Sequence, residues 1–257
     1  MQGIDIPEEI TEIPPGSITI FSAHGVSTAV EEKAAEMGLK TIDATCPLVK
    51  KVHHQAQRYA QKGHVIIIIG HHGHPEVEGT LGRVVGEVHV VSTLDDISKL
   101  KPSSTHRLAY VTQTTLSTDD TRHLISALEK KFPGIKGPAL KDICYATQSR
   151  QDAVRKISEL IDILLVVGSP NSSNSNRLRE TGAAKGLPAY LVDNADAIDL
   201  KWIEGKKKVG ITAGASAPEI LVQNVIERLG RHFSIRVTTM EGTEEAMKFK
   251  QPDFPEL

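Results

Sequence analysis

The chain has 257 residues, of which 39% are hydrophobic and 24% are charged, so it can bury a core and is not a disordered protein. Its 30 Lys and Arg residues nearly balance 32 Asp and Glu residues, and the net charge of −2 argues against nucleic-acid or membrane binding by charge. Two cysteines are too few for a disulfide scaffold and favour a reduced, cytoplasmic compartment. Residues 1–11 lack the apolar core of a signal peptide, and apolar runs such as 65–69 are too short to span a membrane.

Short apolar runs typical of buried strands alternate along the chain with helical patterns. The expected strands, in chain order, are residues 18–21, 39–42, 65–69, 108–111, 163–167, 189–192 and 209–211. The expected helices are residues 28–37, 49–61, 119–131, 151–160 and 218–229. Strands that alternate with helices of this length predict βαβ units and parallel sheets covered on both faces.

The chain also repeats itself with a period of about 100 residues. Cys46 and Cys144 each close a short loop ahead of a helix, and 24 positions after each cysteine a glycine, Gly70 or Gly168, ends an apolar strand. This repeat predicts two α/β units, which we place at residues 46–143 and 144–233, and leaves 234–257 as an extended C-terminal tail.

Residues 1–45 match only the second half of such a unit. The segment 18–27 resembles 108–117, the closing strand and loop of a unit, and a helix and a strand follow it before Cys46. We therefore expect 1–45 to be the remnant of a first unit whose other half, with a third cysteine, is missing from this chain. The alternative is a chain that starts with an edge βα element.

The loops at the carboxyl ends of parallel strands are where α/β proteins place their chemistry. Cys46 and Cys144 lie in such loops at helix starts, where unpaired N–H groups favour a thiolate. Two thiolates with an expected third favour an iron–sulfur cluster with one iron open to substrate, and a tetrahedral zinc site is the competing interpretation. Each cysteine could also be a buried apolar thiol.

Histidines and carboxylates crowd the loop GHHGHPEVE at residues 70–78. Glu76 is a candidate proton donor, because a carboxyl group removed from water has a raised pKa. His71, His72 and His74 could instead bind zinc in a hydrolase, although the spacing is not that of H-E-x-x-H. An exposed polar loop is the third possibility.

The segment 168–177, rich in Ser and Asn, follows a strand and opens a helix. Hydroxyls, amides and backbone N–H groups at a helix start form an anion site, although any one of them could serve only as a cap. Thr114 and Ser216 lie in matching closing loops and could add donors, and His24 and His74 could supply positive charge to a phosphate or diphosphate. No nucleotide-binding glycine pattern is present.

Seven ordered motifs carry a family resemblance. They start at residues 21, 43, 73, 112, 142, 171 and 212 and read FSAHGVS, DATCPLV, GHPEVEG, TQTTLS, DICYAT, NSSNSNRL and TAGASAP. Together they resemble the LytB-type 4-hydroxy-3-methylbut-2-enyl diphosphate reductases, which end the non-mevalonate isoprenoid pathway. The resemblance runs from about residue 16 to the C-terminus.

The resemblance implies an α/β fold, a pseudo-threefold trefoil of three parallel-sheet units around a central site, with the first unit incomplete here. It implies an iron–sulfur cluster of the 4Fe-4S type, with Cys46 and Cys144 as metal ligands and the third cysteine ligand absent from this chain. The implied reaction is reductive dehydroxylation to isopentenyl and dimethylallyl diphosphate. A ferredoxin- or flavodoxin-like protein would donate the electrons.

The resemblance also assigns residue roles. Glu76 is expected to be the proton donor, and Thr114 is expected to contact the substrate hydroxyl and relay protons. The expected substrate-binding residues are His24, His74, Thr114, Ser172, Ser173, Asn174 and Ser216. Two alternatives stay open: an impaired diphosphate-binding fragment of the same fold without a complete cluster, and, more remotely, the zinc hydrolase.

Overall fold

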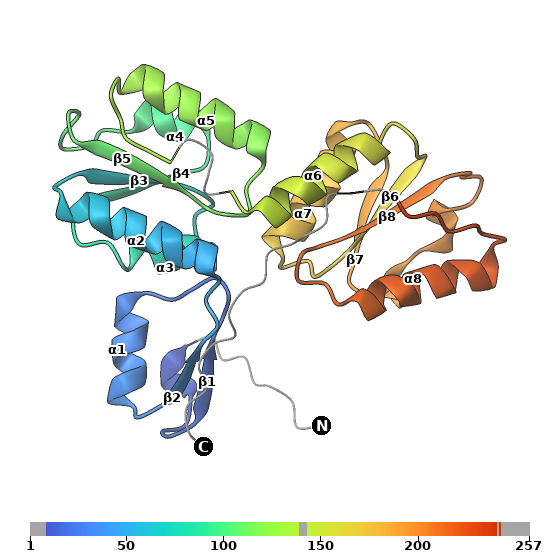
Figure 1. Ribbon diagram of the computed structural model, residues 1–257, viewed down its shortest axis with the longest axis horizontal. Coiled ribbons are helices and arrows are strands. Elements are labelled where there is room, and N and C mark those ends of the chain that lie inside the picture. Colours follow the sequence, from blue (N-terminus) through green and yellow to red (C-terminus); the bar gives the residue numbers. More distant parts are fainter. Residues whose placement is uncertain (1–8, 139–142, 241, 243–257) are drawn as a thin grey trace. The chain divides into compact units, whose positions relative to one another are not determined.

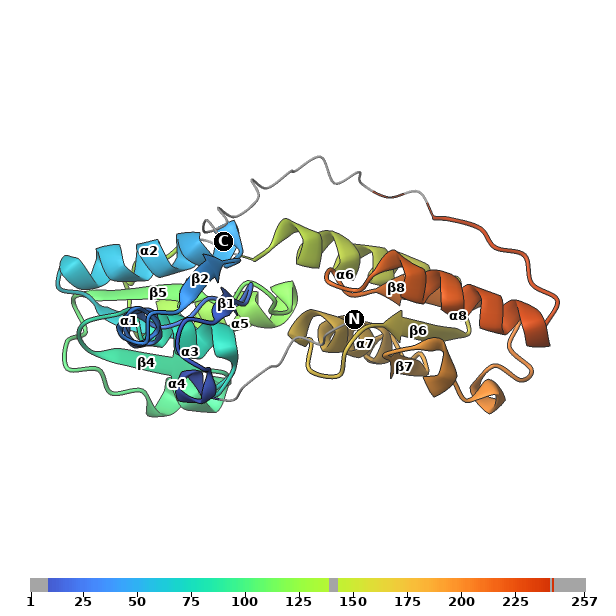
Figure 2. The ribbon, with the colours of Figure 1, turned by 90° about the horizontal axis from the view of Figure 1, so that it is seen from below.

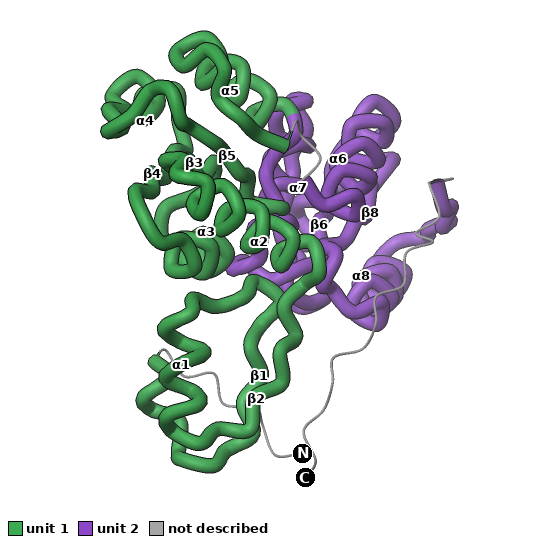
Figure 3. Tube along the Cα trace, turned by 60° about the vertical axis from the view of Figure 1, so that its left-hand side comes forward, with its two compact units in different colours: residues 1–114, 119–142, 247–257 green, residues 115–118, 143–246 purple. Residues whose placement is uncertain are grey.

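The computed structural model describes residues 9–138, 143–240 and 242, and within them eight strands form three parallel sheets (Figure 1). The chain forms two compact units (Figure 3). The first contains residues 1–114, 119–142 and 247–257, and the second contains 115–118 and 143–246. In the described ranges no helix has both the length and the apolar character needed to span a membrane.

The first sheet has two strands. Its elements are η1 (Ile10–Glu12), β1 (Ile18–Phe21), α1 (Thr28–Glu36) and β2 (Lys40–Asp43). The two strands run parallel, with Ile18 opposite Lys40. The side chain of Ser27 caps α1 by accepting a hydrogen bond from the backbone N–H of Val30, so the helix starts directly after the loop that follows β1.

The second sheet has the strand order β4-β3-β5. Its elements are α2 (Pro47–Gln61), β3 (Val65–Ile69), α3 (Pro75–Leu81), β4 (Val88–Val91), α4 (Leu94–Lys99), β5 (Leu108–Thr112) and α5 (Thr118–Lys131). The central strand, β3, is buried along its whole length, as its unbroken apolar sequence predicts. Helices α2 and α3 cover one face, and α4 and α5 cover the other (Figure 1).

The third sheet has the order β7-β6-β8 and repeats the second. Its elements are α6 (Tyr145–Ile157), β6 (Ile163–Val167), α7 (Ser173–Ala184), β7 (Ala189–Val192), η2 (Ala195–Ala197), η3 (Leu200–Trp202), β8 (Val209–Ala213) and α8 (Glu219–His232). Alternate residues of β6 pack on α6 and α7 from one side and on α8 from the other (Figure 2). In both sheets the first strand of the unit is central, which confirms the predicted parallel α/β repeat.

A short parallel contact extends the comparison to the first sheet. After α5, the backbone of Lys136 forms an isolated bridge to Ala109 in β5. The order strand, helix, parallel partner therefore occurs in β5–α5–Lys136 as it does in β1–α1–β2. The assignment of β1 as the closing strand of a unit stays a prediction.

Some elements differ from the prediction. The helix α3, the edge strand β4 and the six-residue α4 were not among the expected elements, because their patterns are too short to show a period. Helix α6 begins at Tyr145, not at residue 151, because polar residues in its first turns hide the apolar face. The divisions at 45/46, 143/144 and 233/234 stay predictions, and residues 1–8, 139–142, 241 and 243–257 lie outside the described residues.

Candidate active site

The centre of the site in the first unit is a carboxyl group paired with a threonine. Glu76 lies in the first turn of α3, after Pro75, and is only 2% exposed. Thr114 follows β5 and donates two hydrogen bonds to this carboxyl, from its backbone N to Oε1 at 2.6 Å and from Oγ1 to Oε2 at 3.0 Å. The structure thus brings the two predicted catalytic residues together.

The pKa of Glu76 is raised to about 7, because burial penalises the charged form more than the two hydrogen bonds from Thr114 favour it. A carboxyl group with a pKa near neutrality is present in both protonated and ionised forms under physiological conditions. Glu76 can therefore give up a proton and take one back, as general acid catalysis requires.

His74 caps the helix that carries Glu76. Its Nδ1 accepts a hydrogen bond from the backbone N–H of Glu76 at 3.1 Å, so Nδ1 carries no proton and Nε2 is the donor. The pKa of His74 is lowered to about 4, chiefly by burial and further by the charges of His24 and His71. His74 is therefore favoured in its neutral form, with Nε2 as its donor.

His24 lies edge to face against His74, with the two ring centroids 5.5 Å apart. Its Nδ1 is 3.3 Å from the hydroxyl of Ser22, and burial lowers its pKa. The sequence led us to expect positive charge from both histidines. In this structure the neutral form of each histidine is favoured instead.

The start of α7 in the second unit holds three of the predicted ligands. Ser172 is the N-cap and accepts a hydrogen bond from the backbone N–H of Ser175 at 3.3 Å, and the hydroxyl of Ser173 is 3.0 Å from that of Thr115. Asn174 is only 6% exposed, and among the described residues neither its Oδ1 nor its Nδ2 has a hydrogen-bond partner. A buried amide without partners is costly, so this feature indicates a ligand-binding role more than a cap.

The loop after β8 approaches the same helix start. A Cβ atom on Gly214 would lie 2.2 Å from the hydroxyl oxygen of Ser175 and 3.7 Å from Nδ2 of Asn174. A side chain at residue 214 would have to displace the Ser175 hydroxyl, and the exposed Ser216 follows two residues later. Within the second unit, Ser216 is therefore carried by a loop that packs on the helix start holding Asn174.

The two cysteines have nearly the same backbone conformation. Cys46 occupies the N-cap position of α2 with φ −54° and ψ 131°, and Cys144 occupies that of α6 with φ −58° and ψ 128°. Both cysteines are free and half-buried, and neither thiol makes a capping hydrogen bond within the described part of the chain. Thiols at helix starts suit metal ligation, so both residues fit the role of cluster ligands. Among the described residues, no three or more Cys, His, Asp or Glu side chains gather as a metal site.

The loop before Cys46 is fixed by Asp43. One carboxylate oxygen accepts the backbone N–H of Thr45 at 3.0 Å, and the other pairs with Lys50 at 2.5 Å. The pKa of Asp43 is lowered, since the bonds from Lys50 and Thr45 together outweigh the effect of burial. Asp43 thus ties the loop to the first turns of α2.

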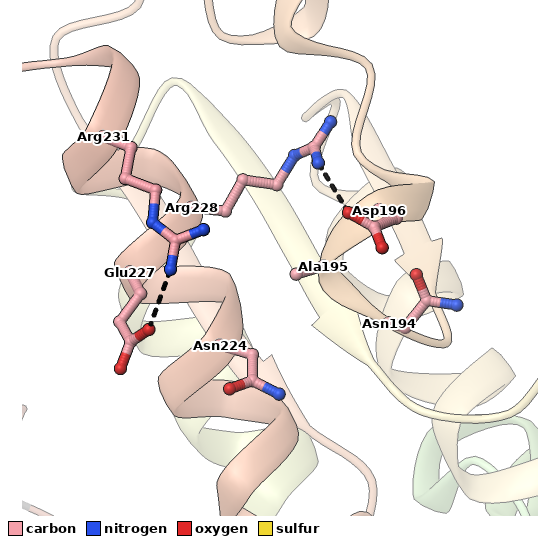
Figure 4. A pocket seen from close by; sticks show the side chains of 7 residues that line it. All are labelled: Asn194, Ala195, Asp196, Asn224, Glu227, Arg228 and Arg231. Carbon is pink, nitrogen blue, oxygen red and sulfur yellow. Dashed lines mark hydrogen bonds and ion pairs between the residues drawn. The ribbon is translucent and has the colours of Figure 1, made fainter.

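A pocket of about 240 Å³ lies elsewhere in the second unit, between η2 and α8 (Figure 4). None of the predicted site residues lines it. Its two arginines already pair with acids, Arg228 with Asp196 at 2.8 Å and Arg231 with Glu227 at 3.5 Å. We assign no role to it in the reaction.

Two buried glutamines support the site and were missed from the sequence. Gln113 lies inside the motif TQTTLS, and its Oε1 accepts the backbone N–H of His71 at 3.1 Å. Gln151, fully buried in α6, donates to the carbonyl of Leu116 at 3.1 Å. The only feature of the sequence that indicates a role for Gln113 is its position between two threonines at the end of a strand. The sequence around Gln151 predicts a helical residue exposed to solvent, so nothing in it indicates a buried role.

Comparison with known proteins extends these observations. A family profile described as LytB protein matches residues 1–230. The 4-hydroxy-3-methylbut-2-enyl diphosphate reductase 1 of Rhodopseudomonas palustris is 54% identical over 251 residues, which are 98% of this chain and 82% of that protein. The corresponding reductase of Zymomonas mobilis is 53% identical over 98% of this chain and 74% of its own length.

Solved structures agree with the sequence matches. The reductase of Plasmodium falciparum superposes with a TM-score of 0.90 and 37% identity, over 96% of this chain and 78% of that one. A structure named as the terminal enzyme of the non-mevalonate pathway gives a TM-score of 0.59 and 33% identity, over 88% of this chain and 80% of that one. The expected α/β fold is confirmed, and the chain belongs to the LytB family.

Proposed function

We propose that this chain carries out the reductive dehydroxylation of 4-hydroxy-3-methylbut-2-enyl diphosphate, the reaction named for its relatives. The observation that carries the proposal is the buried Glu76 carboxyl, which has a pKa of about 7 and is held by Thr114. In the reaction the allylic C–O bond breaks, two electrons and two protons enter, and water and an isopentenyl or dimethylallyl diphosphate leave.

Cys46 and Cys144 would hold the 4Fe-4S cluster, together with a third cysteine that is absent from these 257 residues. When bound, the cluster supplies electrons and a Lewis acid to the substrate. A ferredoxin- or flavodoxin-like protein would reduce the cluster again. Free thiols and a reductive reaction both suit the cytoplasm, where we place the chain.

The residues of the chain would bind the substrate and move its protons. Glu76 would give a proton to the departing hydroxyl, and Thr114 would hold that hydroxyl and pass protons to and from Glu76. The diphosphate would be bound by neutral donors, namely His24, His74, Ser172, Ser173, Asn174 and Ser216. Fixing both ends of the substrate keeps its C–O bond aligned with these groups.

The test is an anaerobic turnover assay of the full chain after iron and sulfide reconstitution, with a reduced dye as electron source and the products measured by NMR. Glu76→Gln should lower the rate by roughly 100-fold or more, because Gln cannot supply a proton. Glu78→Gln is the matched control, since Glu78 lies on the same helix but is exposed. Absence of turnover in a preparation that holds an intact cluster would reject the proposal.

A second candidate is diphosphate binding without reduction. The buried amide of Asn174, which has no hydrogen-bond partner among the described residues, favours it. Calorimetric binding of inorganic diphosphate by protein that retains no cluster would support this candidate. Zinc-dependent release of phosphate would contradict both.

A further inference from the structure

The loop that carries His24, residues 22–27, lies directly on α3. A Cβ atom on Gly79 would be 3.0 Å from the carbonyl oxygen of Gly25, and one on Gly82 would be 2.3 Å from Cβ of Ser27. Any side chain at these two positions would push the loop away. The N-terminal end of α3 therefore carries His74 and Glu76, and its C-terminal end supports the loop that holds His24.

Arg83 fastens this contact. Its Nε donates to the carbonyl of Val26 at 2.7 Å, and its terminal nitrogen forms an ion pair with Glu31 of α1. The Arg83 side chain is only 17% exposed, so water screens the pair less than it would on an open surface. One guanidinium thus ties the loop and α1 to the end of α3.

The other side of the loop rests on α2. Gly25 has a φ of +75°, and the ring of His53 lies where a Cβ of Gly25 would be, 2.5 Å away. His53 is buried, and its Nε2 has no hydrogen-bond partner in the part of the chain that the structure describes. Burial is the main cause that lowers its pKa to about 4. His53 therefore supports the loop by packing, and Arg83 holds it by hydrogen bonding.

We propose that Arg83 is a positioning residue for diphosphate binding, which keeps the His24 ring against His74 by fixing residues 22–27. The inference rests on the proposed function, in which these two histidines contact the diphosphate. In this proposal α3 contributes to the site at both ends. Its N-terminal end carries His74 and Glu76, and its C-terminal end holds the loop of His24 in place.

The experiment uses the full chain and three variants, Arg83→Met, Arg83→Lys and Arg122→Met. Arg122 is the control, because it is an exposed arginine that also pairs with an acid, Asp119, at 3.3 Å. Calorimetry with inorganic diphosphate should show binding about tenfold weaker for Arg83→Met. The variant loses a charged hydrogen bond that orients His24, which is one of the proposed diphosphate-binding residues. Arg83→Lys should recover part of the affinity, and Arg122→Met should match the parent chain.

A second readout separates positioning from a general loss of stability. NMR titration of the histidine ring protons should show the pKa of His24 rising toward its ordinary value in Arg83→Met, because a loosened loop exposes the ring. In turnover assays KM should rise while kcat stays within about twofold, since Glu76 and Thr114 do not touch Arg83. A lower melting temperature with unchanged diphosphate affinity and unchanged His24 titration would overturn the inference.

Failure of the proposed function gives a different result. If the parent chain binds no diphosphate, the proposed function fails, and the His24 titration alone decides the role of Arg83. If Arg83→Met does not fold, Arg83→Lys takes its place, because an ammonium group cannot bond Val26 and Glu31 together as the guanidinium does. Parent-like diphosphate affinity together with a parent-like His24 titration in Arg83→Lys would then count against the inference.

Discussion

Thr114 holds both oxygens of Glu76, through its backbone N and its hydroxyl. Both bonds favour the carboxylate, and burial opposes them and prevails, so the pKa rises from 4.5 to about 7. For a carboxyl group shifted in this direction, the contribution to stability is complete below pH 4.5 and is lost as the pH rises through about 7.

Replacing Glu76 by Gln should therefore stabilise the folded chain at alkaline pH. At about pH 8 the free energy of unfolding should increase by up to about 3 kcal/mol, and at about pH 4 it should change little. Urea denaturation at the two pH values measures the difference, with Glu78→Gln as control. An equal change at both pH values would show that Glu76 is not a buried titrating group.

The hydroxyl of Thr114 should set the pH at which activity is lost. Thr114→Val removes the bond to Oε2 and leaves the backbone bond, so the pKa of Glu76 should rise further. The alkaline limb of the kcat/KM profile should then move to higher pH, even though the rate itself falls. Thr114→Ser keeps the hydroxyl and should keep the limb in place. A limb that stays fixed in Thr114→Val would assign it to another group.

His74 has two separable roles. Asn at this position can still accept the backbone N–H of Glu76, whereas Phe cannot, so His74→Phe should cost about 1 kcal/mol of stability and His74→Asn much less. Both variants lose the Nε2 donor, so both should bind diphosphate more weakly. Chemical denaturation and calorimetry measure the two effects. Equal stability of the two variants would mean that the cap contributes nothing.

Lys131 should be a stabilising residue although it lies far from the chemistry. Its Nζ donates to the carbonyls of Ile97, Ser98 and Leu100 at 2.7, 2.7 and 3.0 Å, around the C-terminal end of α4. Lys131→Met should lower the free energy of unfolding by about 1–2 kcal/mol, because these carbonyls lose a cationic donor. The exposed neighbour Lys130, changed to Met, is the control, and thermal unfolding gives the comparison.

The sequence was informative where one local property decides the structure. The apolar run of β3 predicted a fully buried central strand, and the matched cysteine spacing predicted that the third sheet repeats the second. Glu76 could be singled out because its motif and the expected desolvation pointed to the same residue. Arg83 could not, since its partners Val26 and Glu31 are 57 and 52 positions away and no local pattern links them.

The helices α3 and α7 occupy matching places in the repeat, and each begins with a capping side chain 28 positions after a cysteine. In α3 the cap is the imidazole of His74, whose Nδ1 stops accepting a hydrogen bond when strong acid protonates it. In α7 the cap is the hydroxyl of Ser172, which does not titrate. The two helices therefore begin in the same place of the repeat but differ in their caps. The cap of α3 can be protonated, and the cap of α7 cannot. Acidification should therefore weaken the first turn of α3, which carries His74 and Glu76, before it weakens the first turn of α7.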